Sequence, residues 1–304
     1  MELKKVLFVS QEMAPYLPET RMSVMSRKMA ERIHELGAEV RVFMPNYGMI
    51  NERRYQLHEA QRLTGMNIVI DDTDHPLFMK VATLQPARIQ IYFIFNDDYF
   101  TPKLAKQLEL DSSPADNDER SIFFVRAVIE TVRKMRWNPD VIQCSGWVTA
   151  LAPIYMRQIY AVDPSFRDAK IVYALFDNDF DQPLDSRLAD KLKQDEIPEE
   201  YLKAIEGKEV DYLALTQLAL DHCDAVVQCS PTIKPEVLEL VEKSGLPFLP
   251  YQNGDLPEDE QTAADAEQPL PNEGENQASE QEDEAKPLVL NVNYDAYRDF
   301  YASL

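Results

Sequence analysis

The first 45 residues constrain the fold most, because they form one complete strand-helix-strand pattern. Lys4–Ser10 is a short β-branched and aromatic run, typical of a buried parallel strand. After a loop, apolar residues recur at helical spacing from Met22 until the segment stops at Gly37, as at a glycine C-cap. Val40–Pro45 is a second strand-like run. This order predicts a right-handed βαβ unit of a parallel sheet, with the ligand crevice at the carboxyl ends of its strands.

The rest of the chain extends the same pattern. Segments 67–70, 77–84 and 89–95 predict an inserted β-meander, with turns at 71–76 and 85–87. The fold class is therefore α/β: a Rossmann-like, doubly wound, mainly parallel sheet with a meander. The other expected elements are a long helix capped by Asp118 or Ser121, a strand that begins within 137–142, and a strand at 170–178. They are followed by an irregular charged stretch from 180 to 198, a short helix at 200–205, a helix at 210–221, a strand at 224–230 and a helix that opens at 231–237.

Charge and glycine content exclude several classes of ligand. The net charge is -22, and residues 251–286 carry twelve acidic residues against one lysine. Such a surface gains nothing from counterion release, so neither nucleic acid nor an anionic membrane is expected as a partner. No glycine precedes Gly37, which excludes a dinucleotide fingerprint or a P-loop after the first strand. No cofactor is expected.

The chain carries no export or metal-binding pattern. It has no apolar run of the length that spans a membrane and no apolar signal-peptide segment. Its three cysteines are spaced for neither a disulfide framework nor a zinc site. A cytoplasmic location and no metal site are expected, and the acidic turn around His75 is interpreted as a solvated hairpin tip rather than a cation loop.

Composition divides the chain into three parts. Residues 1–250 contain the α/β pattern, and 251–287 form an acidic stretch that cannot bury enough apolar surface to order itself. Residues 288–304 are short and amphipathic, with tyrosines at helical spacing. Two alternatives remain open for this last segment: it docks on its own domain, or it is a free motif for a partner's groove.

The opening segment carries a family resemblance. Val6–Pro15 resembles the start of bacterial glycogen synthases and plant starch synthases, glucosyltransferases that extend α-1,4-glucans from ADP-glucose or UDP-glucose. In that family a Lys-Thr-Gly-Gly loop holds the nucleotide-sugar phosphates. The matching positions here are Pro18, Glu19, Thr20 and Arg21. The lysine and both glycines are absent, and Arg21 is the one cation that is a candidate replacement.

Two further junctions match the family framework without its polar residues. The segment 137–142 matches a Trp-x-Pro-Asp-Val-Ile junction, after which the family has His-x-His-Asp-Trp-His. Only Trp147 of that cluster remains, because its polar positions are occupied by Gln143, Ser145, Gly146 and Val148. The family histidine that contacts the transferred glucose corresponds to Phe176, which has no hydrogen-bonding group.

The resemblance covers residues 4 to about 243 and implies the N-terminal half of a GT-B glucosyltransferase. It implies no catalytic residue here, and Tyr99, Trp147 and Asp177 are candidate ligand contacts, although packing is the favoured interpretation of Tyr99. The leading hypothesis is a non-catalytic module that binds α-glucan or another protein of glycogen metabolism. Two alternatives remain open: one half of a split glucosyltransferase, and a scaffold with no sugar ligand. In full-length relatives the last helix crosses back onto the N-terminal domain, which is the precedent for self-docking of 288–304.

Overall fold

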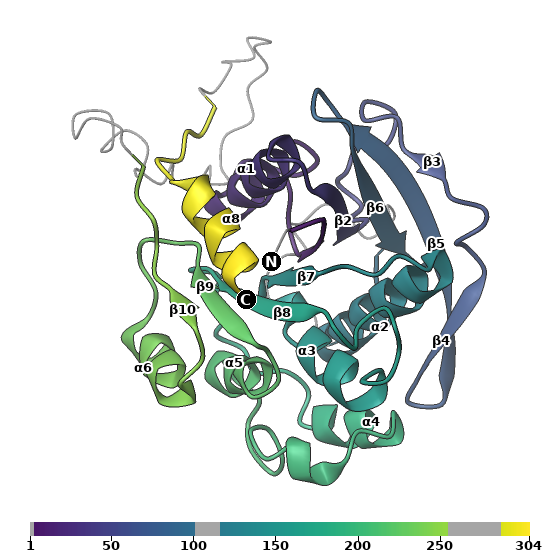
Figure 1. The fold of residues 1–304 in the computed structure, drawn as a ribbon. Helices are drawn as coiled ribbons and strands as arrows, with labels where there is room; N and C mark the ends of the chain where they lie inside the picture. The colour runs from purple at the N-terminus through teal and green to yellow at the C-terminus, as the bar shows by residue number, and fades with distance from the viewer. Residues whose placement is uncertain (1–2, 101–115, 255–286) are drawn as a thin grey trace, which may run out of the picture.

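The structure is a computed structural model that describes residues 3–100, 116–254 and 287–304. Within these residues a 10-stranded sheet is flanked by helices (Figure 1). The strands are β1 (Lys5–Ser10), β2 (Glu39–Pro45), β3 (His58–Glu59), β4 (Met66–Ile70), β5 (Thr73–Leu84), β6 (Ile89–Phe95), β7 (Val141–Ser145), β8 (Lys170–Leu175), β9 (Ala225–Gln228) and β10 (Phe248–Leu249). The helices are α1 (Arg21–Glu35), α2 (Asn117–Met135), α3 (Ala152–Ile154), α4 (Leu188–Gln194), α5 (Tyr212–Leu220), α6 (Pro235–Ser244) and α8 (Tyr294–Ser303).

The strand order places a topological switch point at the centre of the sheet. The order is β10-β9-β8-β7-β1-β2-β6-β5-β3, with β4 paired to β5. From β10 to β6 neighbouring strands are parallel, and the meander strands at the other edge are antiparallel. The chain proceeds outward in opposite directions from β1 and β7, so the crevice expected of an open α/β sheet lies beyond the carboxyl ends of these two strands. The predicted fold class is confirmed.

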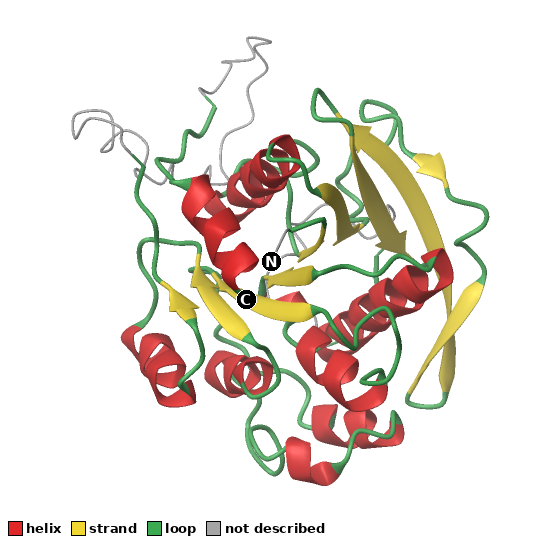
Figure 2. Ribbon diagram, in the orientation of Figure 1, coloured by secondary structure: helices red, strands yellow, loops and turns green. Residues whose placement is uncertain are grey.

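Helices cover both faces of the sheet. The helices α1 and α8 lie side by side on one face, while α2, α3 and α5 cover the other (Figures 1 and 2). The buried face of α1 includes Met22, Met25, Met29 and Ile33, the apolar positions that the helical spacing predicts. None of the described helices is both long enough and apolar enough to span a membrane.

Four local predictions are wrong. Only Asp71 and Asp72, both at positive φ, turn the β4–β5 hairpin, so 73–76 are strand rather than turn. The N-cap of α2 is Asp116, and Asp118 and Ser121 lie inside the helix. The supposedly irregular stretch contains α4, and the helix expected at 200–205 is a single 3₁₀ turn at Glu199–Tyr201. In α4 the buried residues include Lys191, which breaks the apolar pattern that would have revealed the helix.

The C-terminal segment returns to the position where the chain left the domain. Asn253 and Val292 form an isolated antiparallel bridge, and the amide of Asn293 donates to the carbonyl of Gln252 over 3.0 Å. Residues 251–254, assigned from sequence to the flexible linker, are therefore paired with the segment that leads into α8. The remainder of that predicted linker, 255–286, lies outside the described residues.

Candidate functional site

The loop after β1 is folded onto itself and into the core. The carbonyl of Met13 accepts hydrogen bonds from the amides of Tyr16 and Leu17 over 3.2 and 3.3 Å. The ring of Tyr16 contacts Tyr55 and Phe93 edge-to-face, with centroids 5.0 and 4.8 Å apart. These backbone amides are engaged within the loop, whereas a phosphate site needs amides that converge on the ligand.

Thr20 caps α1 and ties the helix to a buried carboxyl group. Its hydroxyl accepts from the amide of Ser23 over 3.0 Å and donates to Glu12 Oε2 over 2.6 Å, and Ser23 Oγ accepts from the Thr20 amide in return. Burial raises the pKa of Glu12, and the hydrogen bond from Thr20 opposes that shift. The helix N-terminus, which in other α/β proteins attracts phosphate, is here capped from within the chain.

The neighbouring positions 19 and 21 face the C-terminal segment. The carboxylate of Glu19 accepts a hydrogen bond from the amide of Leu288 over 2.6 Å. Arg21 is half-buried, and its charge acts on Tyr294, where burial raises the phenol pKa and Arg21 lowers it. Pro18 and Glu19 are exposed. The loop that the resemblance matches to the family's donor loop is thus engaged with residues that follow it by more than 250 positions.

The switch-point crevice, which we define as the space between the loops after β1 and β7, is filled by the side chain of Gln11. Gln11 is 1% exposed, and its backbone amide donates to the carbonyl of Ser145 over 2.9 Å. Gly146 has a φ of 89°, and a Cβ added to it would lie 2.5 Å from Gln11 Oε1 and 2.7 Å from Gln11 Cβ. Gln11 Oε1 also accepts from the Val148 amide over 3.4 Å. Glycine at 146 therefore permits the backbone of one loop to approach the glutamine of the other.

Gln143 and Ser145 lie beneath α8 rather than at an open site. Gln143 Nε2 donates to Ser145 Oγ over 2.8 Å, and both residues are buried. The hydroxyl of Tyr301, itself fully buried, donates to Gln143 Oε1. The hydroxyl of Tyr297 donates to the carbonyl of Gln228 over 2.6 Å. A position that the resemblance assigns to the former active site is thus an anchor for the C-terminal helix.

Aromatic packing covers Trp147. Its ring meets Phe180 edge-to-face with centroids 5.4 Å apart, and Phe180 meets Tyr212 in the same way at 5.7 Å. Trp147 and Phe176 are each only 2% exposed. The candidate ligand contact at Trp147 is therefore placed behind Phe180, a residue that the sequence did not single out.

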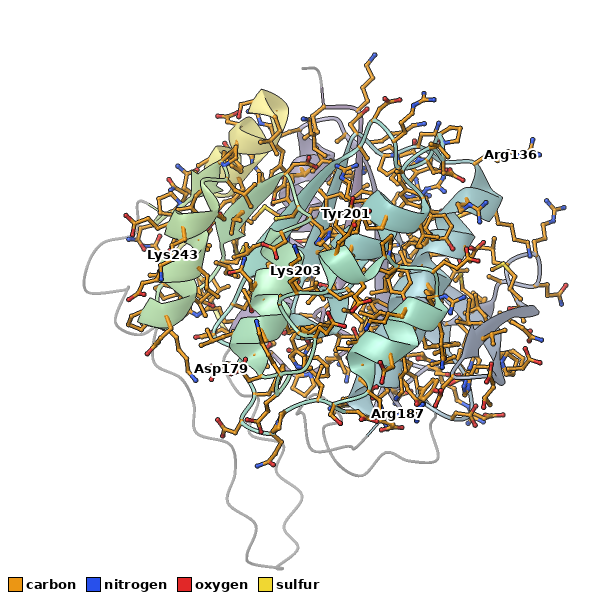
Figure 3. The ribbon with its side chains drawn as sticks, turned by 90° about the horizontal axis from the view of Figure 1, so that it is seen from below. Arg136, Asp179, Arg187, Tyr201, Lys203 and Lys243 are labelled. Atoms are coloured by element: carbon orange, nitrogen blue, oxygen red, sulfur yellow. The ribbon has the colours of Figure 1, made fainter. Side chains whose placement is uncertain are left out.

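An open cavity lies beside this cluster, and we call it the β8–β9 cavity. Its volume is about 300 Å³. The lining residues are Phe176, Asp177, Asp179, Tyr212, Thr232, Ile233, Lys234 and Val237. Asp177 Oδ1 accepts from Ser230 Oγ over 2.7 Å, and Asp179 forms an ion pair with Lys234. Asp179 follows β8 in the chain, and Figure 3 shows it at the margin of the molecule.

Tyr99 belongs to a different, buried cluster. Its hydroxyl donates to Glu119 Oε2 over 2.7 Å and lies 3.1 Å from His75 Nε2. His75 Nδ1 lies 2.8 Å from Asp98 Oδ2, and His75 is only 6% exposed. The interpretation of His75 as part of a solvated hairpin tip is wrong, because β5 begins earlier than expected and carries this residue into the interior.

The sequence also missed a buried ion cluster around Lys191. Its ammonium donates to Asp118 and Glu119 over 2.6 and 2.7 Å, and Asp185 lies 3.4 Å away. Burial disfavours the charge on Lys191, but its hydrogen bonds to the two acids outweigh that cost and raise its pKa. No spacing rule links these residues, since the lysine and Asp118 are 73 positions apart.

Comparison with known proteins identifies relatives of the chain. The family model described as the starch synthase catalytic domain matches residues 5–247. A glycogen synthase of Chlorobium phaeobacteroides is 30% identical over 227 residues, which are 74% of this chain and 45% of the relative. A glycogen synthase of Chlorobaculum parvum is 30% identical over 241 residues, which are 79% of this chain and 48% of the relative. The chain spans about half the length of the curated relatives it matches.

A solved structure shares the fold. The catalytic domain of starch synthase IV from Arabidopsis thaliana, bound to ADP and acarbose, superposes with a TM-score of 0.64 at 17% sequence identity. The match covers 83% of this chain and 52% of that one. It supports the assignment of the sheet to half of a GT-B architecture.

Proposed function

Because the chain belongs to the starch synthase catalytic domain family, we propose that it is a non-catalytic member, a glucan- or protein-binding module in glycogen metabolism. The observation that carries this proposal is the switch-point crevice, occupied by Gln11 against Gly146. In an open α/β sheet this crevice is the ordinary place for a ligand. Here a ligand would have to displace a buried glutamine from the loop after β1 that is hydrogen-bonded to Ser145 at the end of β7 and to Val148 in the loop that follows.

The chemistry of the surrounding residues supports the same proposal. Glycosyl transfer needs groups that stabilise the charge developing on the sugar and its leaving phosphate. The corresponding positions hold Phe176, which cannot donate or accept a hydrogen bond, and the capped N-terminus of α1. The buried carboxyl group of Glu12 behind that helix end adds a repelling group for phosphate whenever it is ionised.

The C-terminal segment supplies a further argument. The bridge between Asn253 and Val292 joins the chain on either side of residues 255–286. The stretch 255–286 has 32 residues, far fewer than a second domain the size of the first would need. The helix α8 docks on the domain nevertheless. A domain closed in this way is suited to binding through its own surface.

The test is a donor-binding and transfer assay on the full chain. Calorimetric titration with ADP-glucose and UDP-glucose at millimolar concentration is expected to give no saturable heat, and radiolabelled glucose should not be incorporated into glycogen. A full-length glycogen synthase serves as the positive control. Saturable donor binding or glucan extension by the isolated chain would overturn the non-catalytic assignment.

Affinity electrophoresis in glycogen-containing gels separates the two kinds of binding module. Retardation relative to a control protein would assign glucan as the ligand, because exposed aromatic and polar groups bind sugars without catalytic residues. Unchanged mobility would assign a protein partner.

A further inference from the structure

The β8–β9 cavity is chemically distinct from the switch-point crevice. A volume of about 300 Å³ lies at the small end of the range for ligand pockets, so it suits one side chain or one small ring. Its base is apolar, with Phe176, Ile233 and Val237, and its rim is charged. The cavity therefore combines an apolar floor with a polar mouth, as a pocket for an amphipathic side chain requires.

The charges around the cavity are predominantly negative. Asp177 and Asp179 line it directly. Burial raises the pKa of the Tyr212 phenol, and the proximity of both carboxylates raises it further. The ammonium of Lys234 also faces Asp181 and Glu236, and its pKa is raised chiefly by its hydrogen bond to Asp179. A positively charged ligand is favoured at such a site, and an anionic one is not.

Lys234 indicates which group the cavity accepts. Its ammonium forms an ion pair with Asp179, and both residues line the cavity. The lysine side chain is 55% exposed, whereas that of Asp179 is 25% exposed. An exposed ion pair of this kind contributes little to stability, so an external cation can replace the lysine at Asp179 at small cost.

A guanidinium fits the two carboxylates better than an ammonium. It presents five N–H donors in a plane, which allows it to bond Asp177 and Asp179 together, and its flat face can lie against an aromatic ring such as Phe176 or Tyr212. The overall charge of -22 attracts basic partners over longer distances.

We propose that the β8–β9 cavity receives an arginine side chain of a partner protein, with Lys234 as the group that it displaces. This inference rests on the proposed binding role and names the chemistry of the partner. It is separable from that role, because the arginine probe and the maltose competition below report on this cavity independently of the donor and glycogen assays.

The test uses N-acetyl-arginine amide as the probe and NMR chemical-shift changes of the full chain as the readout. Saturable shifts of cavity residues are expected at millimolar concentration, weakening with added salt. Asp177→Asn should weaken binding about tenfold, as expected for loss of roughly one charge-assisted hydrogen bond. Lys234→Gln should strengthen binding several-fold, because the competing cation is removed.

The matched control is Lys243→Gln. Lys243 is an exposed lysine of α6 that pairs with Glu239 and does not line the cavity, so its replacement removes the same charge and should leave the affinity unchanged. N-acetyl-lysine amide should bind more weakly than the arginine probe. The proposal is overturned if Lys234→Gln shows no binding, if Asp177→Asn binds as tightly as the wild type, or if maltose displaces the probe with higher affinity.

Discussion

The switch-point crevice and the β8–β9 cavity lie at the same edge of the sheet, yet one is filled and the other open. In the crevice, Gln11 from the loop after β1 packs against Gly146 from the loop after β7. In the cavity, the loops after β8 and β9 leave a volume of about 300 Å³ between Phe176 and Lys234. At the crevice, the absence of a side chain at Gly146 allows Gln11 to approach closely. At the cavity, the two aspartates are instead held by Ser230 and Lys234 in the lining.

The site that we propose for a partner's arginine differs from the usual ligand position in such sheets. A ligand at the crevice would compete with a buried, hydrogen-bonded glutamine. A ligand at the cavity competes only with an exposed lysine. The three predictions below are ordered from the largest expected effect on stability to the smallest.

The largest effect is expected from Tyr301, whose hydroxyl donates to Gln143 of β7, the strand that ends at the crevice. Tyr301→Ala removes a fully buried ring and should lower the free energy of unfolding by about 3–5 kcal/mol. Tyr301→Phe removes only the hydroxyl and should cost about 1 kcal/mol. Urea unfolding followed by circular dichroism measures both. An unfolding curve of Tyr301→Ala that matches the wild type would show that α8 does not hold this part of the sheet.

The second effect tests the filling of the crevice directly. Gly146→Ala places a Cβ 2.5 Å from Gln11 Oε1 at a φ of 89° and should destabilise the protein by about 1–3 kcal/mol. Adding Gln11→Ala should recover part of that loss, because the contact with Oε1 is removed, while the contact with the Cβ at 2.7 Å and the backbone cost remain. Gly245→Ala is the control, since φ is 67° there and nothing lies within 4 Å of the added Cβ. Strict additivity of Gln11→Ala and Gly146→Ala would contradict the packing described for the crevice.

The smallest effect concerns the carboxyl group behind α1. Burial raises the pKa of Glu12 above its usual value of 4.5, so the folded state favours the protonated form. The stability that protonated Glu12 contributes is fully present below its pKa in the unfolded chain. It is lost as the pH rises through its pKa in the folded protein. Glu12→Gln should therefore raise the melting temperature at pH 7 relative to the wild type, and this gain should disappear below pH 4.5. Glu59→Gln, at an exposed position of β3, controls for loss of charge alone. A gain that persists unchanged in acid would exclude burial of the carboxylate as its cause.

Local sequence patterns predicted the regular elements well where one face alone is buried. The spacing of Met22, Met25, Met29 and Ile33 gave α1, and its end near Gly37 follows from the glycine's positive φ. The same reasoning failed for α4, where Lys191 occupies a buried position, and for the N-terminus of α2, where Asp118 pairs with that lysine instead of capping. In both cases a charge is buried because a partner distant in sequence neutralises it, and no local pattern records such a partner.

The sequence predicts, through its resemblance to the family, that Phe176, Gly146 and Val148 occupy positions that are polar in the family. Only the tertiary structure decided what replaced them. Gln143 meets Tyr301 across 158 positions, and Gln11 meets Gly146 because β1 and β7 are neighbours in register. Periodicity and composition are properties of neighbouring residues, whereas the filling of a crevice depends on how two distant loops approach each other after the sheet has formed.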